Sequence, residues 1–217
     1  MKMKARNKIL LLALCMAALI AVSVIGTMAY LTSTDKVINT FTVGKVDIKL
    51  DEAKVSTDGA LVEGAGRVKE NTYKLLPGHT YNKDPMVTVL SGSESSYVKM
   101  TVTFSKANEL DAIFAPTGAD LTSIFNGYDA ANWISKGNTK DTTADTRTYE
   151  FWYKESVGAP TADVTLDALF DSITVPGTIT GEQLKTIEGM TITVNAYAIQ
   201  ADGFADAAAA WAAANFN

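Results

Sequence analysis

Strict alternation of apolar and polar residues is the feature that most constrains how this chain can fold. It is clearest over residues 97–104, where lysine and threonine separate four apolar residues, Val98, Met100, Val102 and Phe104. Segments 148–153 and 190–198 repeat the pattern, and 87–89 is a shorter example. Successive side chains of a β-strand point to opposite faces, so these segments are predicted strands with one buried and one solvated face. Such strands are typical of antiparallel sheets.

The phase of the alternation changes once, near Gly44. Phe41 and Val43 occupy odd positions, whereas Val46, Ile48 and Leu50 occupy even positions. One extra residue at Gly44 and Lys45 would return the apolar side chains to the same face, and glycine tolerates the geometry of such an insertion. We therefore predict a β-bulge at Gly44 within a strand over 41–50.

Helical spacing is confined to three short segments. Apolar residues over 166–173 follow an i, i+3, i+4, i+7 pattern, Thr180 and Gln183 form a capping box, and an alanine-rich helix capped by Asp202 or Asp206 is expected near the C-terminus. The expected fold class is mainly β, an antiparallel β-sandwich of jelly-roll or Greek-key type with a few short helices.

The N-terminus has the pattern of a cleavable signal peptide. Four basic residues precede an uncharged apolar run over 9–25, and small residues follow at Thr27 and Ala29. This pattern predicts cleavage by a signal peptidase between Ala29 and Tyr30. The alternative is an uncleaved anchor, because 17 residues lie at the lower end of what spans a bilayer as a helix.

Composition limits the function classes. Loss of residues 1–29 removes four basic and no acidic residues, taking the formal net charge from −5 to −9, so nucleic acid and anionic membrane surfaces are poor partners. Membrane contact is expected only through the uncleaved signal. A single cysteine, Cys15, excludes an internal disulfide, and a single histidine, His79, excludes a His-Glu-x-x-His zinc motif. We expect no cofactor, no metal site and no catalytic residue.

Three blocks of sequence resemble the TasA/camelysin family of secreted bacterial matrix-fibre proteins. The first is the cleavage region, Thr27-Met-Ala-Tyr-Leu-Thr-Ser-Thr34, with the strand Asn39-Thr-Phe-Thr-Val-Gly-Lys-Val-Asp-Ile48. The second is the turn Leu75-Leu-Pro-Gly78, followed by Lys83 and segment 87–89, and the third is Ala198-Ile-Gln-Ala-Asp-Gly203.

The resemblance implies a jelly-roll subunit, 40–217, that polymerises into extracellular fibres after signal cleavage. The segment exposed by cleavage, 30–39, would act as a donor strand that completes the sheet of a neighbouring copy, with Tyr30, Leu31, Val37 and Ile38 as apolar anchors. The implied location is extracellular or on the cell surface. The implied partners are other copies of this chain, the signal peptidase and an accessory or anchoring protein.

Two other interpretations of the chain stay open. In one, segment 30–39 is the first strand of its own domain or a frayed terminus, and the protein is a monomeric cell-surface adhesin or matrix-binding module. In the other, more distant one, the chain is a metalloprotease, as some camelysin-like members have been described, although only His79 could supply an imidazole.

Processing gives the first testable prediction. Because small residues occupy positions 27 and 29, mass spectrometry of the secreted protein should identify Tyr30 as its first residue. Secreted protein that retains Met1, or that begins well beyond residue 30, would contradict the assignment.

Overall fold

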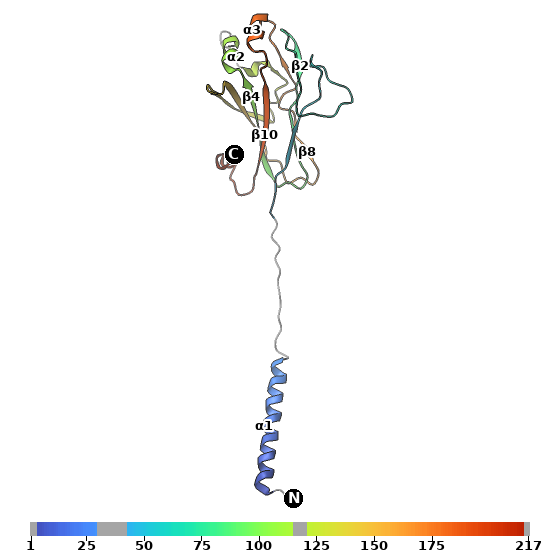
Figure 1. Ribbon diagram of the computed structural model, residues 1–217, viewed down its shortest axis with the longest axis vertical. Coiled ribbons are helices and arrows are strands. Elements are labelled where there is room, and N and C mark those ends of the chain that lie inside the picture. The colour runs from blue at the N-terminus through green and yellow to red at the C-terminus, as the bar shows by residue number, and fades with distance from the viewer. Residues whose placement is uncertain (1–3, 30–42, 115–120, 215–217) are drawn as a thin grey trace. The chain divides into compact units, whose positions relative to one another are not determined.

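The computed structural model describes residues 4–29, 43–114 and 121–214, and the chain divides into two compact units, Met1–Thr42 and Val43–Asn217. In the first unit, helix α1 spans Ala5–Ala29 (Figure 1). Thr27 and Ala29 are therefore in its last turn. None of the helices among the described residues is long and apolar enough to cross a membrane.

The described part of the second unit is mainly antiparallel β structure, as the alternation predicts. A four-stranded sheet has the order β10-β4-β7-β6, and two three-stranded sheets have the orders β1-β3-β8 and β2-β9-β5. The strands are β1 (Ile48–Asp51), β2 (Thr80–Asn82), β3 (Met86–Val89), β4 (Ser96–Ser105), β5 (Phe125–Asn126), β6 (Trp133–Asp141), β7 (Thr146–Tyr153), β8 (Val164–Thr165), β9 (Ser172–Thr174) and β10 (Ile192–Gln200).

The longest strand, β4, is central to the four-stranded sheet. It pairs with β10 along one edge and with β7 along the other, and its residues alternate between buried and half-buried over its whole length. The four apolar residues predicted to share one face, Val98, Met100, Val102 and Phe104, are all fully buried. The alternation therefore identified both the strand and its inner face correctly.

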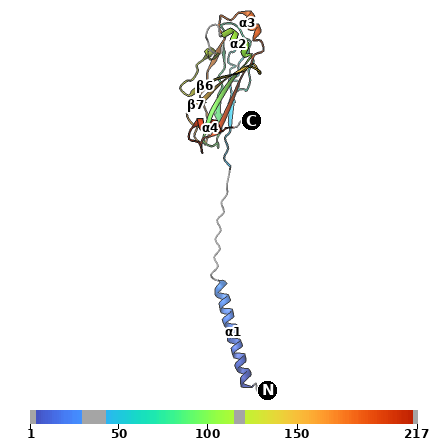
Figure 2. The same cartoon turned by 90° about the vertical axis from the view of Figure 1, so that its left-hand side faces the viewer.

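All three sheets contribute to one hydrophobic core. Tyr81 of β2, Val87 of β3, Phe125 of β5 and Ile173 of β9 belong to the same buried cluster as the inner face of β4. In Figure 1, β4 and β10 lie side by side, with β2 and β8 across the unit from them. Figure 2 turns β6 and β7 toward the viewer, and helix α4 (Ala207–Ala213) is seen on the same side of the unit.

Two of the three expected helices are present. Helix α3 (Gly181–Thr186) begins at the capping box of Thr180 and Gln183, and α4 begins at Asp206, whose side chain accepts from the Ala209 amide. Helix α2 (Ala107–Phe114) and a 3-10 turn, η2 (Leu121–Ile124), were not expected.

The prediction of a helix over 166–173 is wrong. Its four apolar side chains, Leu166, Leu169, Phe170 and Ile173, are buried, but the main chain bonds to other segments. The Leu166 amide donates to the Val87 carbonyl, and the Leu169 amide donates to the Pro85 carbonyl. An irregular segment that crosses the core can bury residues at helical spacing without forming a helix.

The structure places Gly44 ahead of the first strand rather than inside it. Strand β1 begins at Ile48, and Gly44 does not have a positive φ. The Asp47 carbonyl accepts from the Leu90 amide, and the Lys45 carbonyl accepts from the Glu94 amide, so two residues on one side span four on the other. The extra residues therefore lie in the turn at 90–94, opposite this segment. Phe41 and Thr42 lie outside the described residues, so the bulge at Gly44 stays a prediction.

Gly44 and Gly59 offer a matched pair of substitutions. Gly59 has a φ of +81°, and an added Cβ would lie 2.6 Å from the Tyr81 Cα. An added Cβ at Gly44 meets the side chain of Glu94, which can move. We expect Gly59→Ala to lower the free energy of unfolding by about 2 kcal/mol or more, and Gly44→Ala by no more than about 0.5 kcal/mol. Urea denaturation of the two variants measures the difference, and equal effects would contradict this account.

Candidate functional site

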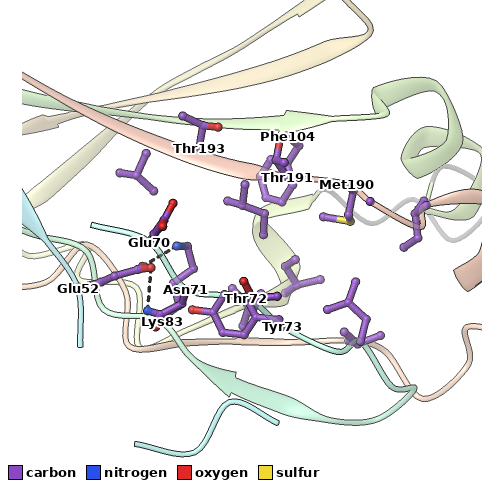
Figure 3. A pocket seen from close by; sticks show the side chains of 18 of the residues that line it. Glu52, Glu70, Asn71, Thr72, Tyr73, Lys83, Phe104, Met190, Thr191 and Thr193 are labelled. Carbon is purple, nitrogen blue, oxygen red and sulfur yellow. Dashed lines mark hydrogen bonds and ion pairs between the residues drawn. The ribbon is translucent and has the colours of Figure 1, made fainter. Parts of the chain in front are cut away.

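A large groove opens between strand β10 and the segment 68–75, and it reaches the hydrophobic core (Figure 3). Its volume is about 1210 Å³. One wall is formed by residues 187–194, which lead into β10, and the opposite wall by 68–75 with the end of β1. We call this the β10 groove. Its lining includes apolar core side chains, among them Phe104, Leu110, Ile173, Val175, Ile179 and Ile187.

Strand β10 is an edge strand, and its free edge faces the groove. At the two ends of β10, the Thr191 carbonyl accepts from the Ser105 amide, and the Ala201 amide donates to the Ser95 carbonyl. In an antiparallel pair, alternate residues direct both backbone polar groups to the same neighbour. Odd-numbered residues of β10 therefore bond to β4, and Ile192 and Val194 direct their backbone N–H and C=O groups away from β4.

The opposite wall is extended but is not part of a sheet. Asn71, Tyr73 and Leu75 are half-buried, whereas Thr72 and Lys74 between them are exposed. Within the described part of the chain, no backbone–backbone hydrogen bond joins residues 69–73 to another segment. Side chains hold this wall in place instead: the Asn71 amide donates to the Ala53 carbonyl, and the Tyr73 hydroxyl donates to the Asn82 carbonyl.

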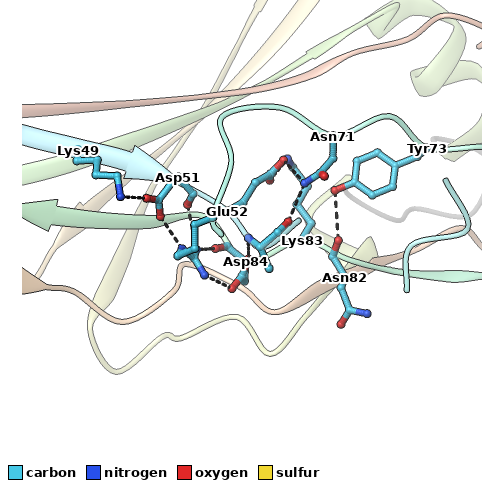
Figure 4. Close-up of polar contacts among 10 residues, drawn as sticks. Lys49, Asp51, Glu52, Asn71, Tyr73, Asn82, Lys83 and Asp84 are labelled. Carbon is cyan, nitrogen blue, oxygen red and sulfur yellow. Dashed lines mark hydrogen bonds and ion pairs between the residues drawn. The ribbon is translucent and has the colours of Figure 1, made fainter. Parts of the chain in front are cut away.

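A polar cluster, made of the buried residues Glu52 and Lys83 and the half-buried Asn71, lies at the end of the groove next to β1 (Figures 3 and 4). Lys83 Nζ donates to Glu52 Oε2 at 2.6 Å, and Asn71 Nδ2 donates to Glu52 Oε1 at 3.0 Å. The Lys83 and Glu52 side chains are only 7% and 9% exposed. Burial of a charge without a partner costs several kcal/mol. The Lys83–Glu52 ion pair is therefore needed whenever these two side chains are buried as they are here.

A second ion-pair network ties the loop over 52–71 to the strands beside it (Figure 4). Arg67 Nε donates to Asp51 Oδ1 at 2.5 Å, and Arg67 Nη1 donates to Asp84 Oδ2 at 2.8 Å. Burial acts to raise the pKa of Asp51, but hydrogen bonds from Lys49 and Arg67 outweigh it and hold that pKa below its usual range. The Asp51 carboxylate therefore stabilises the fold above pH 4 or so, and this contribution is lost as the pH falls through its lower folded-state pKa.

Tyr73 completes the groove wall between the polar cluster and the apolar floor. Burial raises the pKa of its phenol far above the usual range, and the nearby Glu52 carboxylate adds to the effect. The Tyr73 ring also contacts the Tyr81 ring edge-on, with centroids 5.6 Å apart. Tyr73 therefore stays neutral at ordinary pH and presents an aromatic surface to the groove.

The sequence-predicted donor and cleavage residues are only partly covered. Thr27 and Ala29 belong to α1, whereas Tyr30, Leu31, Val37 and Ile38 lie outside the described residues. The cleavage site and the donor strand stay predictions.

Two residues with possible ligand chemistry contact their own chain. His79 Nε2 lies 2.6 Å from the Asp58 carbonyl, and its ring packs on Tyr81. Trp152 faces away from the core, but Lys136 Nζ lies 4.3 Å from its ring centroid and the Trp211 ring of α4 lies 6.2 Å from it. Lys136 and Trp211 therefore cover part of the Trp152 ring.

The described residues contain no group of three or more histidine, cysteine, aspartate or glutamate side chains that could hold a metal ion. The Asp141 carboxylate accepts from the Thr143 and Ala144 amides, and Asp145 accepts from the Asn108 amide. These two carboxylates shape the β6–β7 turn and the start of α2.

The β10 groove has no signal of its own in the amino-acid sequence. The alternation over 190–198 was recognised as a strand, but nothing in it distinguishes an edge strand from a central one. Lys83 belongs to the second block that resembles the TasA/camelysin family, and no pattern around Glu52 or Asn71 marks either residue as its partner. Their pairing joins residues 31 positions apart and follows from the tertiary fold.

Comparison with protein-family models, with curated proteins and with solved structures finds no match for this chain.

The Lys83–Glu52 pair gives a stability prediction. Lys83→Met leaves the Glu52 carboxylate buried without a cation and should lower the free energy of unfolding by about 3 kcal/mol or more. The double variant Lys83→Met/Glu52→Leu removes both charges and should recover most of this loss. The exposed Lys185–Glu182 pair is the control, and Lys185→Met should cost no more than about 0.5 kcal/mol. Urea denaturation measures all three, and equal effects of the two lysine variants would contradict the assignment.

Proposed function

We propose that this protein is a secreted structural subunit that polymerises into extracellular fibres by N-terminal donor-strand exchange. In this proposal, signal cleavage after Ala29 exposes the segment 30–39, and that segment fills the β10 groove of a neighbouring copy. The folded part would be a β-sandwich of jelly-roll type that is incomplete along one side. The observation that carries the proposal is the β10 groove, where a free strand edge and open access to the core coincide.

The groove has the properties that an added strand requires. An incoming extended chain can bond to the unpaired backbone groups of Ile192 and Val194, and it can place alternate side chains against the core. Native proteins usually cover or charge a free edge of this kind, because it otherwise pairs with other chains. Ile192 and Val194 instead present apolar side chains beside their free backbone groups.

The segment 30–39 suits this groove. It supplies apolar residues at Tyr30, Leu31, Val37 and Ile38, separated by threonine, serine and one Asp-Lys pair. Threonine favours strands, and the segment contains no proline or glycine. Before cleavage, the hydrophobic run over 9–25 would hold this segment at the membrane, so removal of the signal would permit assembly.

One alternative function has support from chain length. Residues 30–42 number 13, and a strand rises about 3.3 Å per residue, so the segment could reach about 43 Å. That length would also allow it to enter the groove of its own chain. The product would be a monomeric cell-surface or matrix-binding module.

A truncation tests the proposal. The chain beginning at Tyr30 should form fibres by negative-stain electron microscopy, whereas the chain beginning at Thr40 should stay monomeric. The shorter chain should still fold, because the buried core cluster, as far as the described residues show it, lies entirely beyond residue 43. Circular dichroism and urea denaturation of the two chains check this point.

The control is Phe104→Ala in the chain beginning at Tyr30. It removes a fully buried ring and should lower the free energy of unfolding by about 3–5 kcal/mol. Both the folded fraction and the yield of fibres should therefore fall. Fibres from the chain beginning at Thr40 would rule out the donor segment. A chain beginning at Tyr30 that stays monomeric at high concentration would favour the binding module instead.

A further inference from the structure

The polar cluster of Glu52, Asn71 and Lys83 brings an amine, an amide and a carboxylate together. Lys83 Nζ donates to one oxygen of the Glu52 carboxylate, Oε2, at 2.6 Å, and Asn71 Nδ2 donates to the other, Oε1, at 3.0 Å. One carboxylate therefore holds both the lysine amine and the asparagine amide (Figure 4). An amine and an amide on either side of a group that can carry protons are suited to form a new amide bond.

The Asn71 side chain is oriented as the acyl group of such a reaction. Its Oδ1 accepts a hydrogen bond from the Val55 amide at 3.0 Å, and its Nδ2 also donates to the Ala53 carbonyl at 2.8 Å. A backbone N–H on Oδ1 stabilises the negative charge that develops on a carbonyl oxygen under attack. The Glu52 carboxylate beside Nδ2 can deliver the proton that a leaving nitrogen needs.

Burial of the lysine and the glutamate favours the reactive form of the amine. The Lys83 and Glu52 side chains are only 7% and 9% exposed, so little water reaches either charge. Transfer of one proton from Lys83 Nζ to Glu52 removes both buried charges, and it leaves a neutral amine that can act as a nucleophile. The low exposure that makes an isolated charge costly therefore lowers the cost of this transfer.

We propose that Lys83 and Asn71 form an intramolecular isopeptide bond, with Glu52 as the proton carrier. Lys83 Nζ passes one proton to Glu52 and attacks Asn71 Cγ, so the Nζ–Cγ bond forms. Glu52 then gives this proton to Nδ2, the Cγ–Nδ2 bond breaks, and ammonia leaves. The second proton of the original ammonium stays on Glu52. The product is a neutral amide beside a neutral carboxylic acid, and the reaction consumes no other reagent.

The bond would fasten a wall of the β10 groove to the neighbouring sheet. Asn71 belongs to that wall, and Lys83 directly follows β2, which pairs with β9. The sequence beyond residue 29 contains no cysteine, so no disulfide can supply a covalent link there. The reaction occurs within one chain and does not depend on the proposed fibre function.

Mass spectrometry of the secreted protein tests the proposal. Loss of ammonia lowers the intact mass by about 17 Da relative to the sequence from its observed first residue. Trypsin cleaves after an unmodified lysine, so it cannot cleave after Lys83 once the bond has formed. Digestion should therefore yield a branched peptide that joins 70–74 to 75–99, whereas an unlinked chain yields the peptide 75–83.

Two variants separate the bond from the ion pair. Lys83→Arg keeps a cation beside Glu52, but a guanidinium stays protonated and cannot attack, so this chain should fold and keep its full mass. Glu52→Gln removes the proton carrier and should also keep its full mass. Lys185→Met, at an exposed ion pair, is the control and should lose ammonia as the chain without substitutions does. Lys83→Arg is also the unlinked reference for the stability of the Lys83–Glu52 pair, because Lys83→Met loses both the pair and the bond.

Three results would overturn the proposal. Full mass with an unlinked peptide 75–83 would mean that the three residues form hydrogen bonds and an ion pair only. Loss of ammonia that persists in Lys83→Arg would mean that an asparagine has cyclised on its own backbone. Loss of about 18 Da, with a branched peptide that contains 50–54, would mean that Lys83 attacks Glu52 and releases water. None of these results affects the proposed fibre function, which the truncation tests separately.

Discussion

Pairing of β4 along both of its edges organises the folded unit. Because β10 and β7 satisfy its backbone groups on either side, β4 can bury one whole face, from Ser96 to Phe104, without leaving unpaired amides in the core. The other sheets then cover this face. Once β4 and β7 are fixed, β10 is the only strand of the sheet with a free edge beside the opening to the core, since β6 is the edge on the other side.

The wall opposite β10 shows how the groove is kept open. A β-ladder between segment 68–75 and β10 would close it. The wall instead bonds to the segments on its other side, through the side chains of Asn71 and Tyr73 and through the backbone of Val68 and Lys74. Burial of the Lys83–Glu52 pair adds to this constraint, because moving the wall would separate or expose the pair. The same buried charges that hold the wall therefore preserve the unpaired edge.

Short-range sequence patterns predicted the strands and helices that interactions within a few residues determine. The alternation in 97–104 identified β4 and its buried face, and the Thr180–Gln183 capping box identified α3, because both signals lie within a few residues. The helix predicted over 166–173 is absent, because apolar side chains at helical spacing can be buried without helical backbone hydrogen bonds. The groove could not be predicted, because sheet order decides whether β10 is an edge, and sheet order depends on pairing between distant segments such as β4 and β10.

In the proposed fibre, the segment 30–39 of each subunit would fill the β10 groove of the next copy, a head-to-tail contact that continues as a filament where it does not close. Such a fibre would end in one unfilled groove and one unused donor segment. An accessory or anchoring protein could then act at the first end by offering an extended apolar strand, or at the second by offering a free sheet edge. Under this proposal, the β10 groove restricts the kind of partner that would terminate or tether the fibre.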